Sequence, residues 1–251
     1  MSVVPGKREP EGLVPSFKGV HAPKGQSTAS AAKSADGRAS VTFGPKCSEP
    51  LSRSELLSWL RSGSAAGSET QANDDAGGAD GKPSGTGTAV TRIVLHCSDT
   101  WPSANFTIEK LAASHRKAGY GPYPGYHFFV TRDGWLYYCR PLNVRGCHAK
   151  GYNTGSIGVC YEGGRKEECK RWHQNECEHC GKRGCKCPKG LHTMSPWEDN
   201  RTAEQMVTLH VLLSTLHELW PEAVILGHRD LPGVKKACPC LDAKREYEYL
   251  S

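Results

Sequence analysis

The sequence predicts an α/β protein with a mixed central β-sheet flanked by helices. The first observation is a change in composition near residue 88, after which short β-branched runs alternate with segments of helical periodicity. The second is the order of those segments, which is strand, helix, hairpin, strand, helix, strand, helix. Elements in this order are typical of a sheet that carries helices on its faces.

Residues 1–88 have the composition of a low-complexity arm and linker. They are rich in Gly, Ser, Ala, Pro and Lys, and their only aromatic residues are Phe17, Phe43 and Trp59. Such a segment buries too little apolar surface to offset its ordering entropy, so we expect most of it to be disordered. Apolar residues at helical spacing near 52–61, with Ser52 or Ser54 as N-cap, predict a short helix that either docks or forms only transiently.

Residues 89–251 are expected to form the folded domain. Asp133-Gly134 predicts a β-hairpin, and Thr202 with Gln205 predicts a capping box at the start of a long helix. Side chains alternate along a strand, so His96 is expected to face a cleft while Cys97 packs in the core. The predicted strands are 92–97, 126–132, 135–140, 156–161 and 223–226, and the predicted helices are 107–119, 202–220 and 242–250.

Seven short motifs follow one another in this domain. They are His96-Cys97-Ser98, Gly125-Tyr126-His127-Phe128, Arg132-Asp133-Gly134, His148-Ala149-Lys150-Gly151-Tyr152-Asn153, Ser156-Ile157-Gly158-Val159-Cys160, Gly227-His228-Arg229-Asp230 and Lys236-Ala237-Cys238-Pro239. Together they resemble the N-acetylmuramoyl-L-alanine amidase type 2 family, which includes phage lysozymes that are amidases and the peptidoglycan recognition proteins. The resemblance covers roughly residues 90–250. It implies an amidase/PGRP-like fold and hydrolysis of the amide between N-acetylmuramic acid and L-alanine in bacterial peptidoglycan.

The resemblance implies that His96, His228 and Cys238 are zinc ligands. Two imidazoles and one thiolate leave a fourth zinc position open for water, which distinguishes a catalytic zinc from a structural one. Such a zinc ion lowers the pKa of its water and polarises a carbonyl, which suits amide hydrolysis. Cys240 competes with Cys238 for the third ligand position, and the Lys-Ala-Cys-Pro match favours Cys238.

The same resemblance implies that Tyr126 lies beside the metal water and Lys236 near the scissile carbonyl. A fixed cation stabilises the charge of the tetrahedral intermediate, and a phenol orients water or transfers a proton. Which of the two moves the proton is left open. His148 and Asn153 are expected to line the substrate groove, although bracing of a loop is an alternative for His148. Other histidines are expected to be structural, packing or surface residues: His115, His127, His210 and His217.

An insertion at about 165–200 concentrates cysteines. Cys177-x2-Cys180 is a zinc half-site, and the short, polar segment has little core of its own, so a metal would explain how it folds. We therefore expect a second, structural zinc, with disulfides or free thiols as alternatives. The candidate ligands are Cys169, Cys177, Cys180, Cys185 and Cys187.

The net charge and the targeting signals of the sequence bear on where the protein acts and what it binds. The formal net charge is +6, no run of apolar residues approaches the length that spans a membrane, and we expect no standard secretory signal peptide at the N-terminus. We expect synthesis in the cytoplasm and action on the cell wall, as by a phage endolysin that passes from the host cytoplasm to the periplasm. We expect the protein to be a monomer and do not expect it to bind nucleic acid. The arm is a candidate binding site for a protein partner. The alternative functions are a peptidoglycan-binding module without catalysis, and an amidase that also regulates a polymerase.

Overall fold

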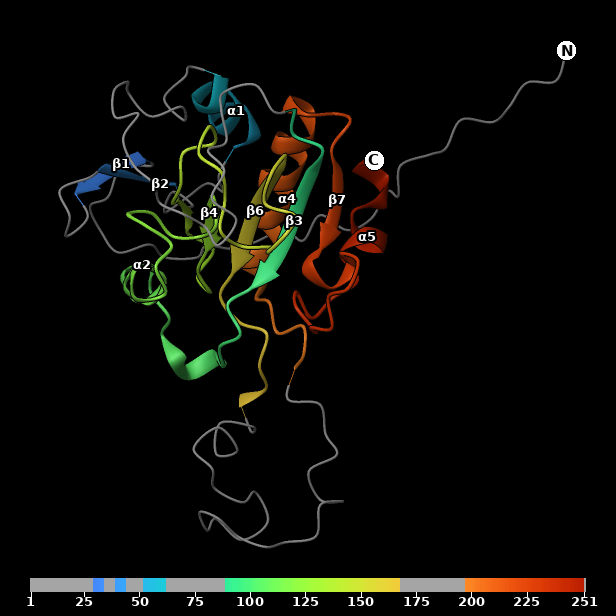
Figure 1. Ribbon diagram of the computed structural model, residues 1–251. Helices are drawn as coiled ribbons and strands as arrows, with labels where there is room; N and C mark the ends of the chain where they lie inside the picture. The colour runs from blue at the N-terminus through green and yellow to red at the C-terminus, as the bar shows by residue number, and fades with distance from the viewer. Residues whose placement is uncertain (1–28, 34–38, 44–51, 62–88, 168–196, 251) are drawn as a thin grey trace, which may run out of the picture.

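The computed structural model describes residues 29–33, 39–43, 52–61, 89–167 and 197–250. Their centre is a mixed sheet in the order β1-β2-β5-β4-β6-β3-β7 (Figure 1). The pairs β3–β6, β3–β7 and β4–β6 are parallel, and the remaining pairs are antiparallel. The strands are β1 (Ala29–Lys33), β2 (Ala39–Phe43), β3 (Arg92–Cys97), β4 (Phe128–Val130), β5 (Leu136–Tyr138), β6 (Ser156–Tyr161) and β7 (Val224–Gly227).

Strand β3 lies between two parallel neighbours, which explains its continuous apolar run. Its alternate side chains enter different clusters. Ile93, Leu95 and Cys97 pack in the largest core cluster, whereas Val94 packs in a smaller one with Leu226. The predicted alternation is therefore confirmed, and it directs His96 away from the face that receives Cys97.

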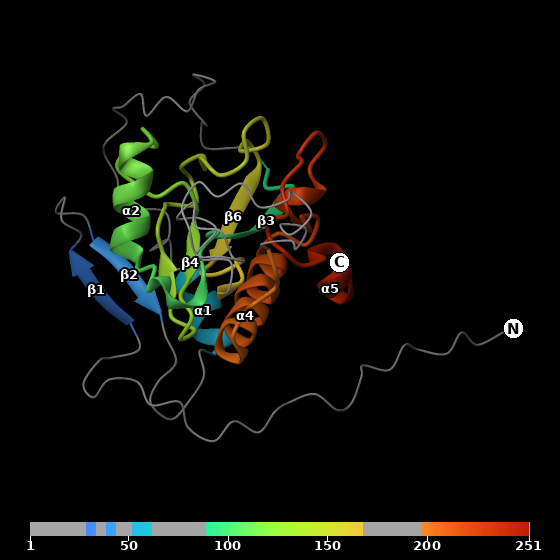
Figure 2. The same cartoon turned by 90° about the horizontal axis from the view of Figure 1, so that it is seen from below.

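Helices cover both faces of the sheet. Figure 2 shows α4 (Ala203–Leu219) and α1 (Arg53–Arg61) on one face and α2 (Ile108–Lys117) on the other. The predicted capping box is present, since Thr202 accepts the N–H of Gln205 and Gln205 accepts the N–H of Thr202. The C-terminal helix is shorter than predicted, because α5 (Ala243–Glu246) is followed by a separate 3-10 helix, Glu248–Leu250. None of the described helices is long and apolar enough to cross a membrane.

The predicted short helix near 52–61 is confirmed as α1, and it docks on the domain. Leu56 is completely buried and Leu60 is nearly so, both within the core cluster that α4 and the sheet share. The ring of Trp59 meets the ring of Tyr138 edge-on at a centroid distance of 4.9 Å. The apolar face of α1 is thus part of the main core.

Polar contacts fix the start and the orientation of α1. Ser52 is the N-cap, because its Oγ accepts the N–H of Glu55 at 3.2 Å. Arg53 and Arg61 both reach Glu218 of α4, with N–O distances of 2.6 and 3.1 Å. Both arginine side chains are more than half exposed, so these ion pairs orient the helix more than they stabilise it.

Two short segments of the arm, residues 29–33 and 39–43, are strands that the sequence analysis does not predict. These residues form β1 and β2, and β2 pairs with β5, which extends the sheet beyond the hairpin. Composition does not indicate these strands, because a strand can pair with a sheet edge through backbone hydrogen bonds, which need few apolar side chains. The expectations for the linker 63–88 and for the rest of the arm lie largely outside the described residues.

Candidate metal centre

The three predicted metal ligands converge at the carboxyl end of two neighbouring strands. His96 is the penultimate residue of β3, and His228 directly follows β7. Because β3 and β7 are parallel, their carboxyl ends lie at the same edge of the sheet. Cys238 reaches this edge from the loop that follows. One donor atom each from His96, His228 and Cys238 lies within 4.8 Å of the other two.

The spacing of the donor atoms suits zinc. The Nδ1 atom of His96 lies 3.6 Å from the Sγ atom of Cys238. With ordinary zinc–nitrogen and zinc–sulfur bond lengths, two ligands of a tetrahedral site are about 3.6 Å apart. His96 and His228 are 1% and 8% exposed, and Cys238 is half-buried. The residues therefore fit a zinc ion in their number, donor type and spacing.

Short-range contacts hold the Cys238 loop against the two strands. The N–H of Arg229 donates to the carbonyl of Cys238 at 2.8 Å, and the N–H of Cys97 donates to the Cys238 thiol at 3.3 Å. Gly227 permits the approach of Pro239, since a Cβ at position 227 would lie 2.5 Å from the Pro239 Cδ. The loop that delivers the thiol is thus tied to both histidine-bearing segments.

Both candidate histidine ligands are neutral near pH 7. Burial, followed by the neighbouring His148, His228 and Lys236, lowers the pKa of His96 well below its usual value. Burial and then the charge of Lys236 lower the pKa of His228 to about 4. A neutral imidazole has the free lone pair that metal binding requires.

His148 contacts the candidate ligand His96 from the side opposite Cys238. The Nδ1 atom of His148 lies 3.1 Å from the Nε2 atom of His96, and its own Nε2 lies 3.4 Å from Ser156 Oγ. The side-chain carbonyl of Asn153 accepts the N–H groups of His148 and Ala149 at 2.9 and 2.8 Å. The Asn153 side chain therefore braces the loop that carries His148. Substrate contacts of both residues remain a prediction.

The two predicted catalytic residues flank the cluster. The ring centroids of Tyr126 and His96 are 5.1 Å apart, and burial, with further contributions from nearby cysteines, raises the pKa of Tyr126 well above its usual value. Lys236 is exposed, and its charge acts on both His96 and His228. The Tyr126 phenol thus keeps its proton, while the Lys236 side chain is exposed to solvent.

His115, which the sequence predicts to be a surface or packing residue, supports the segment that carries Tyr126. Its Nδ1 accepts the N–H of Gly125 at 2.8 Å, and its ring lies 5.3 Å from the ring of Tyr126. The helix α2 thereby supports the segment that presents Tyr126. Helical periodicity marks His115 only as a residue of α2, because its partner belongs to another segment.

We expect His115 and His127 to make the free energy of unfolding depend on pH. Both accept backbone N–H groups at Nδ1, from Gly125 and Gly158 respectively, so protonation would break these bonds. Burial and then Arg140 lower the pKa of His115 to about 4 and that of His127 to about 3. The unfolded chain binds these protons near pH 6.5, so the free energy of unfolding should fall as pH decreases from about 6.5 to about 4. The expected slope is about 1.4 kcal/mol per pH unit for each histidine.

Urea unfolding of the metal-free protein between pH 7.5 and 4 measures this slope. The matched variant is His115→Asn, whose side-chain oxygen keeps an acceptor near the Gly125 N–H but cannot be protonated. Its unfolding free energy should depend less steeply on pH than that of the wild type. Parallel pH curves for the two proteins would contradict the assignment.

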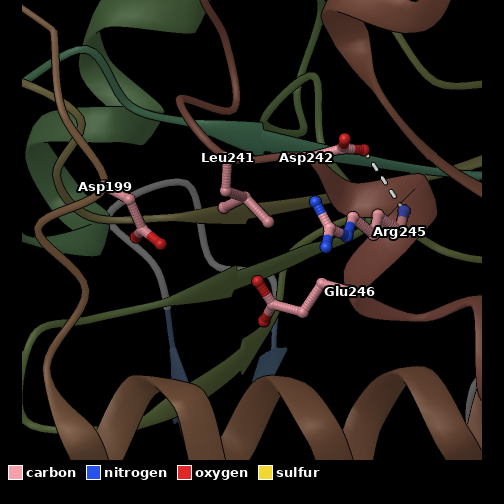
Figure 3. A pocket seen from close by; sticks show the side chains of 5 residues that line it. All are labelled: Asp199, Leu241, Asp242, Arg245 and Glu246. Carbon is pink, nitrogen blue, oxygen red and sulfur yellow. Dashed lines mark hydrogen bonds between the residues drawn. The ribbon is translucent and has the colours of Figure 1, made fainter.

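A surface hollow elsewhere contains none of these residues. Figure 3 shows it lined by Asp199, Leu241, Asp242, Arg245 and Glu246. The carboxylates of Asp199 and Glu246 are both bound by the guanidinium of Arg201, and that of Asp242 caps α5. The candidate site is therefore identified by its ligand cluster and not by this hollow.

The predicted second zinc site lies outside the described residues. This applies to all five candidate ligands, which are Cys169, Cys177, Cys180, Cys185 and Cys187. Cys240 is not a member of the His96–His228–Cys238 group, because its thiol lies beside Cys97. The geometry thus favours Cys238 over Cys240 as the third donor.

The sequence of this chain matches a known protein family over the region that contains the candidate metal centre. Residues 86–240, more than half of the chain, match the family model described as N-acetylmuramoyl-L-alanine amidase. The chain belongs to this family. The match spans all three members of the candidate metal centre and both predicted catalytic residues. The protein is therefore a peptidoglycan amidase, as the motifs predicted.

The amidase has relatives among phage proteins. The endolysin of Escherichia phage T7 is 34% identical over 156 residues, which cover 62% of this chain and 84% of that protein. The endolysin of Enterobacteria phage K11 is 30% identical with the same coverage. Among solved structures, the endolysin amidase LysCS from Clostridium intestinale URNW is similar with a TM-score of 0.45 and 24% identity. That likeness covers 65% of this chain and 84% of the other.

Proposed function

We propose that the amidase is a zinc-dependent phage endolysin whose metal ligands are His96, His228 and Cys238. The observation that carries the proposal is the cluster of two neutral, buried imidazoles and one thiol with donor atoms within 4.8 Å. Zinc bound there would supply a Lewis acid and a bound water of near-neutral pKa. A set of three protein donors leaves room for that water.

Tyr126 and Lys236 are the proposed catalytic residues. The Tyr126 phenol keeps its proton, and its ring lies 5.1 Å from the His96 ring, which supports a role as a hydrogen-bond donor beside the ligand cluster. The Lys236 ammonium precedes Cys238 by two residues and is exposed, so it can face the substrate carbonyl and balance developing negative charge. The amide bond between the lactyl group of N-acetylmuramic acid and L-alanine is the proposed target.

The endolysin role rests on the relatives, since those of phages T7 and K11 carry that name. With this role we propose synthesis in the host cytoplasm and action at the cell wall. A binding module without catalysis is the competing function, and the complete ligand set together with Lys236 argues against it. No described contact favours a polymerase partner, and the apolar face of α1, within the arm, is buried in the protein's own core.

Digestion of purified peptidoglycan tests the proposed function. With zinc-loaded protein we expect new L-alanine N-termini and intact glycan strands by mass spectrometry. A zinc chelator should abolish the release, and added zinc should restore it. Release that persists in chelator would contradict the metal dependence. Muropeptide binding without release from several peptidoglycan types would instead support the binding module.

The cysteine-rich insertion is proposed to hold a second, structural zinc. The support is its sequence alone, in which Cys177 and Cys180 have the spacing of a zinc half-site. Zinc content measured on Cys177→Ser protein tests it, because one ion of two should be lost while amide hydrolysis persists.

A further inference from the structure

Two thiols that the proposed metal site does not use face each other beside it. Cys97 is the last residue of β3 and is 5% exposed, and Cys240 is half-buried on the loop after Cys238. Their Sγ atoms are 3.7 Å apart. A disulfide bond is about 2.0 Å long, so small rotations of the two side chains would bring the sulfurs to bonding distance.

The backbone around the pair holds the two thiols in this arrangement. The N–H of Cys240 donates to the carbonyl of Ala237 at 2.7 Å, which closes a tight turn in which Cys240 has a φ of 70°. Gly164 leaves the space that the sulfurs occupy, since a Cβ there would lie 2.6 Å from the Cys97 Sγ. The Cys240 thiol also donates to the Gly164 carbonyl at 3.3 Å. The short distance between the two sulfurs therefore depends on three segments: the end of β3, the backbone at Gly164 and the turn that ends at Cys240.

We propose that Cys97 and Cys240 form an intramolecular disulfide when the protein meets a small-molecule disulfide such as oxidised glutathione. The half-buried Cys240 thiol attacks first, which forms a mixed disulfide and releases one small thiol. The Cys97 thiol then displaces the second small thiol and closes the bond to Cys240. Two protein thiols are oxidised and one small disulfide is reduced to two thiols, so atoms and electrons balance.

The bond would tie together the two segments that carry metal ligands. Cys97 adjoins His96, and Cys240 is two residues from Cys238. The bridge would oppose separation of β3 from the Cys238 loop, so metal should leave the oxidised protein more slowly. This consequence rests on the proposed metal site, whereas formation of the disulfide does not.

Mass spectrometry of the zinc-loaded full-length protein tests the disulfide. The protein is incubated with oxidised or reduced glutathione, alkylated, and digested. A cross-linked peptide pair containing Cys97 and Cys240 is expected only after oxidation, in the wild type and in the matched control Cys139→Ser. Cys139 is a buried thiol of another segment, and its Sγ donates to the Tyr137 carbonyl at 3.5 Å. The pair should be absent from Cys240→Ser. Alkylation of both thiols after oxidation, or a link from Cys97 to Cys238, would overturn the proposal.

Metal release tests the consequence separately. Zinc transfer to a colorimetric chelator should be several-fold slower for the oxidised wild type than for the reduced wild type. For Cys240→Ser the two treatments should give equal rates. Equal rates for the wild type would overturn the retention effect. A protein that binds no metal at all would refute the proposed function, while the peptide mapping would still decide the disulfide.

Discussion

Cys238→Ser protein is expected to lose amide hydrolysis by on the order of 10³-fold or more, about 4 kcal/mol of transition-state stabilisation. A serine hydroxyl does not ionise near pH 7 and is a poor zinc donor, so the ligand set falls from three to two. Serine is nearly isosteric with cysteine, and position 238 is half-buried, so the fold should persist. The measurements are kcat/KM on purified peptidoglycan and zinc per protein by elemental analysis.

The matched control is two residues away. Cys240→Ser removes a thiol of the same loop that is not a member of the His96–His228–Cys238 group, and it should retain hydrolysis and zinc. Thermal unfolding of both variants shows whether either substitution disturbs the fold. Loss of zinc from Cys240→Ser with retention in Cys238→Ser would show that the third ligand is the other cysteine.

Leu56→Ala is expected to destabilise the protein by roughly 2–4 kcal/mol. Leu56 is completely buried in the main core although it belongs to a helix that precedes the folded domain by about 30 residues. Truncation would remove its packing against the core and leave a cavity that α1 and α4 fill only partly. Urea unfolding of the full-length protein, with the transition midpoint and slope fitted together, measures the change.

Comparing Arg61→Ala with Leu56→Ala shows whether α1 is held on the domain by its ion pair or by its buried apolar side chains. The Arg61 side chain is 58% exposed in its ion pair with Glu218, so its loss should cost less than about 1 kcal/mol. Both variants should keep the zinc content of the wild type, because α1 packs against α4 and supplies none of the three candidate ligands. A Leu56→Ala protein as stable as the wild type would show that α1 does not dock in solution.

Local signals of the sequence determined much of this protein. Strands β3 and β6 match their predicted bounds, and the Thr202 capping box opens α4 as expected. These elements were predictable because side-chain alternation and helix capping act between residues close in the chain. The three metal-ligand candidates were also named from their motifs, and alternation alone directed His96 away from the core face that receives Cys97.

Only the tertiary structure decided which distant groups meet. It paired β2 with β5, placed His115 under the segment of Tyr126, and set His148 against His96. It also brought the Cys97 and Cys240 thiols together across 143 positions of sequence. Such contacts leave no periodic signal in the sequence. Backbone pairing at a sheet edge is compatible with many different side chains, and a single side-chain hydrogen bond needs only one suitable atom in the right position. Their formation depends on how the whole sheet and its loops pack.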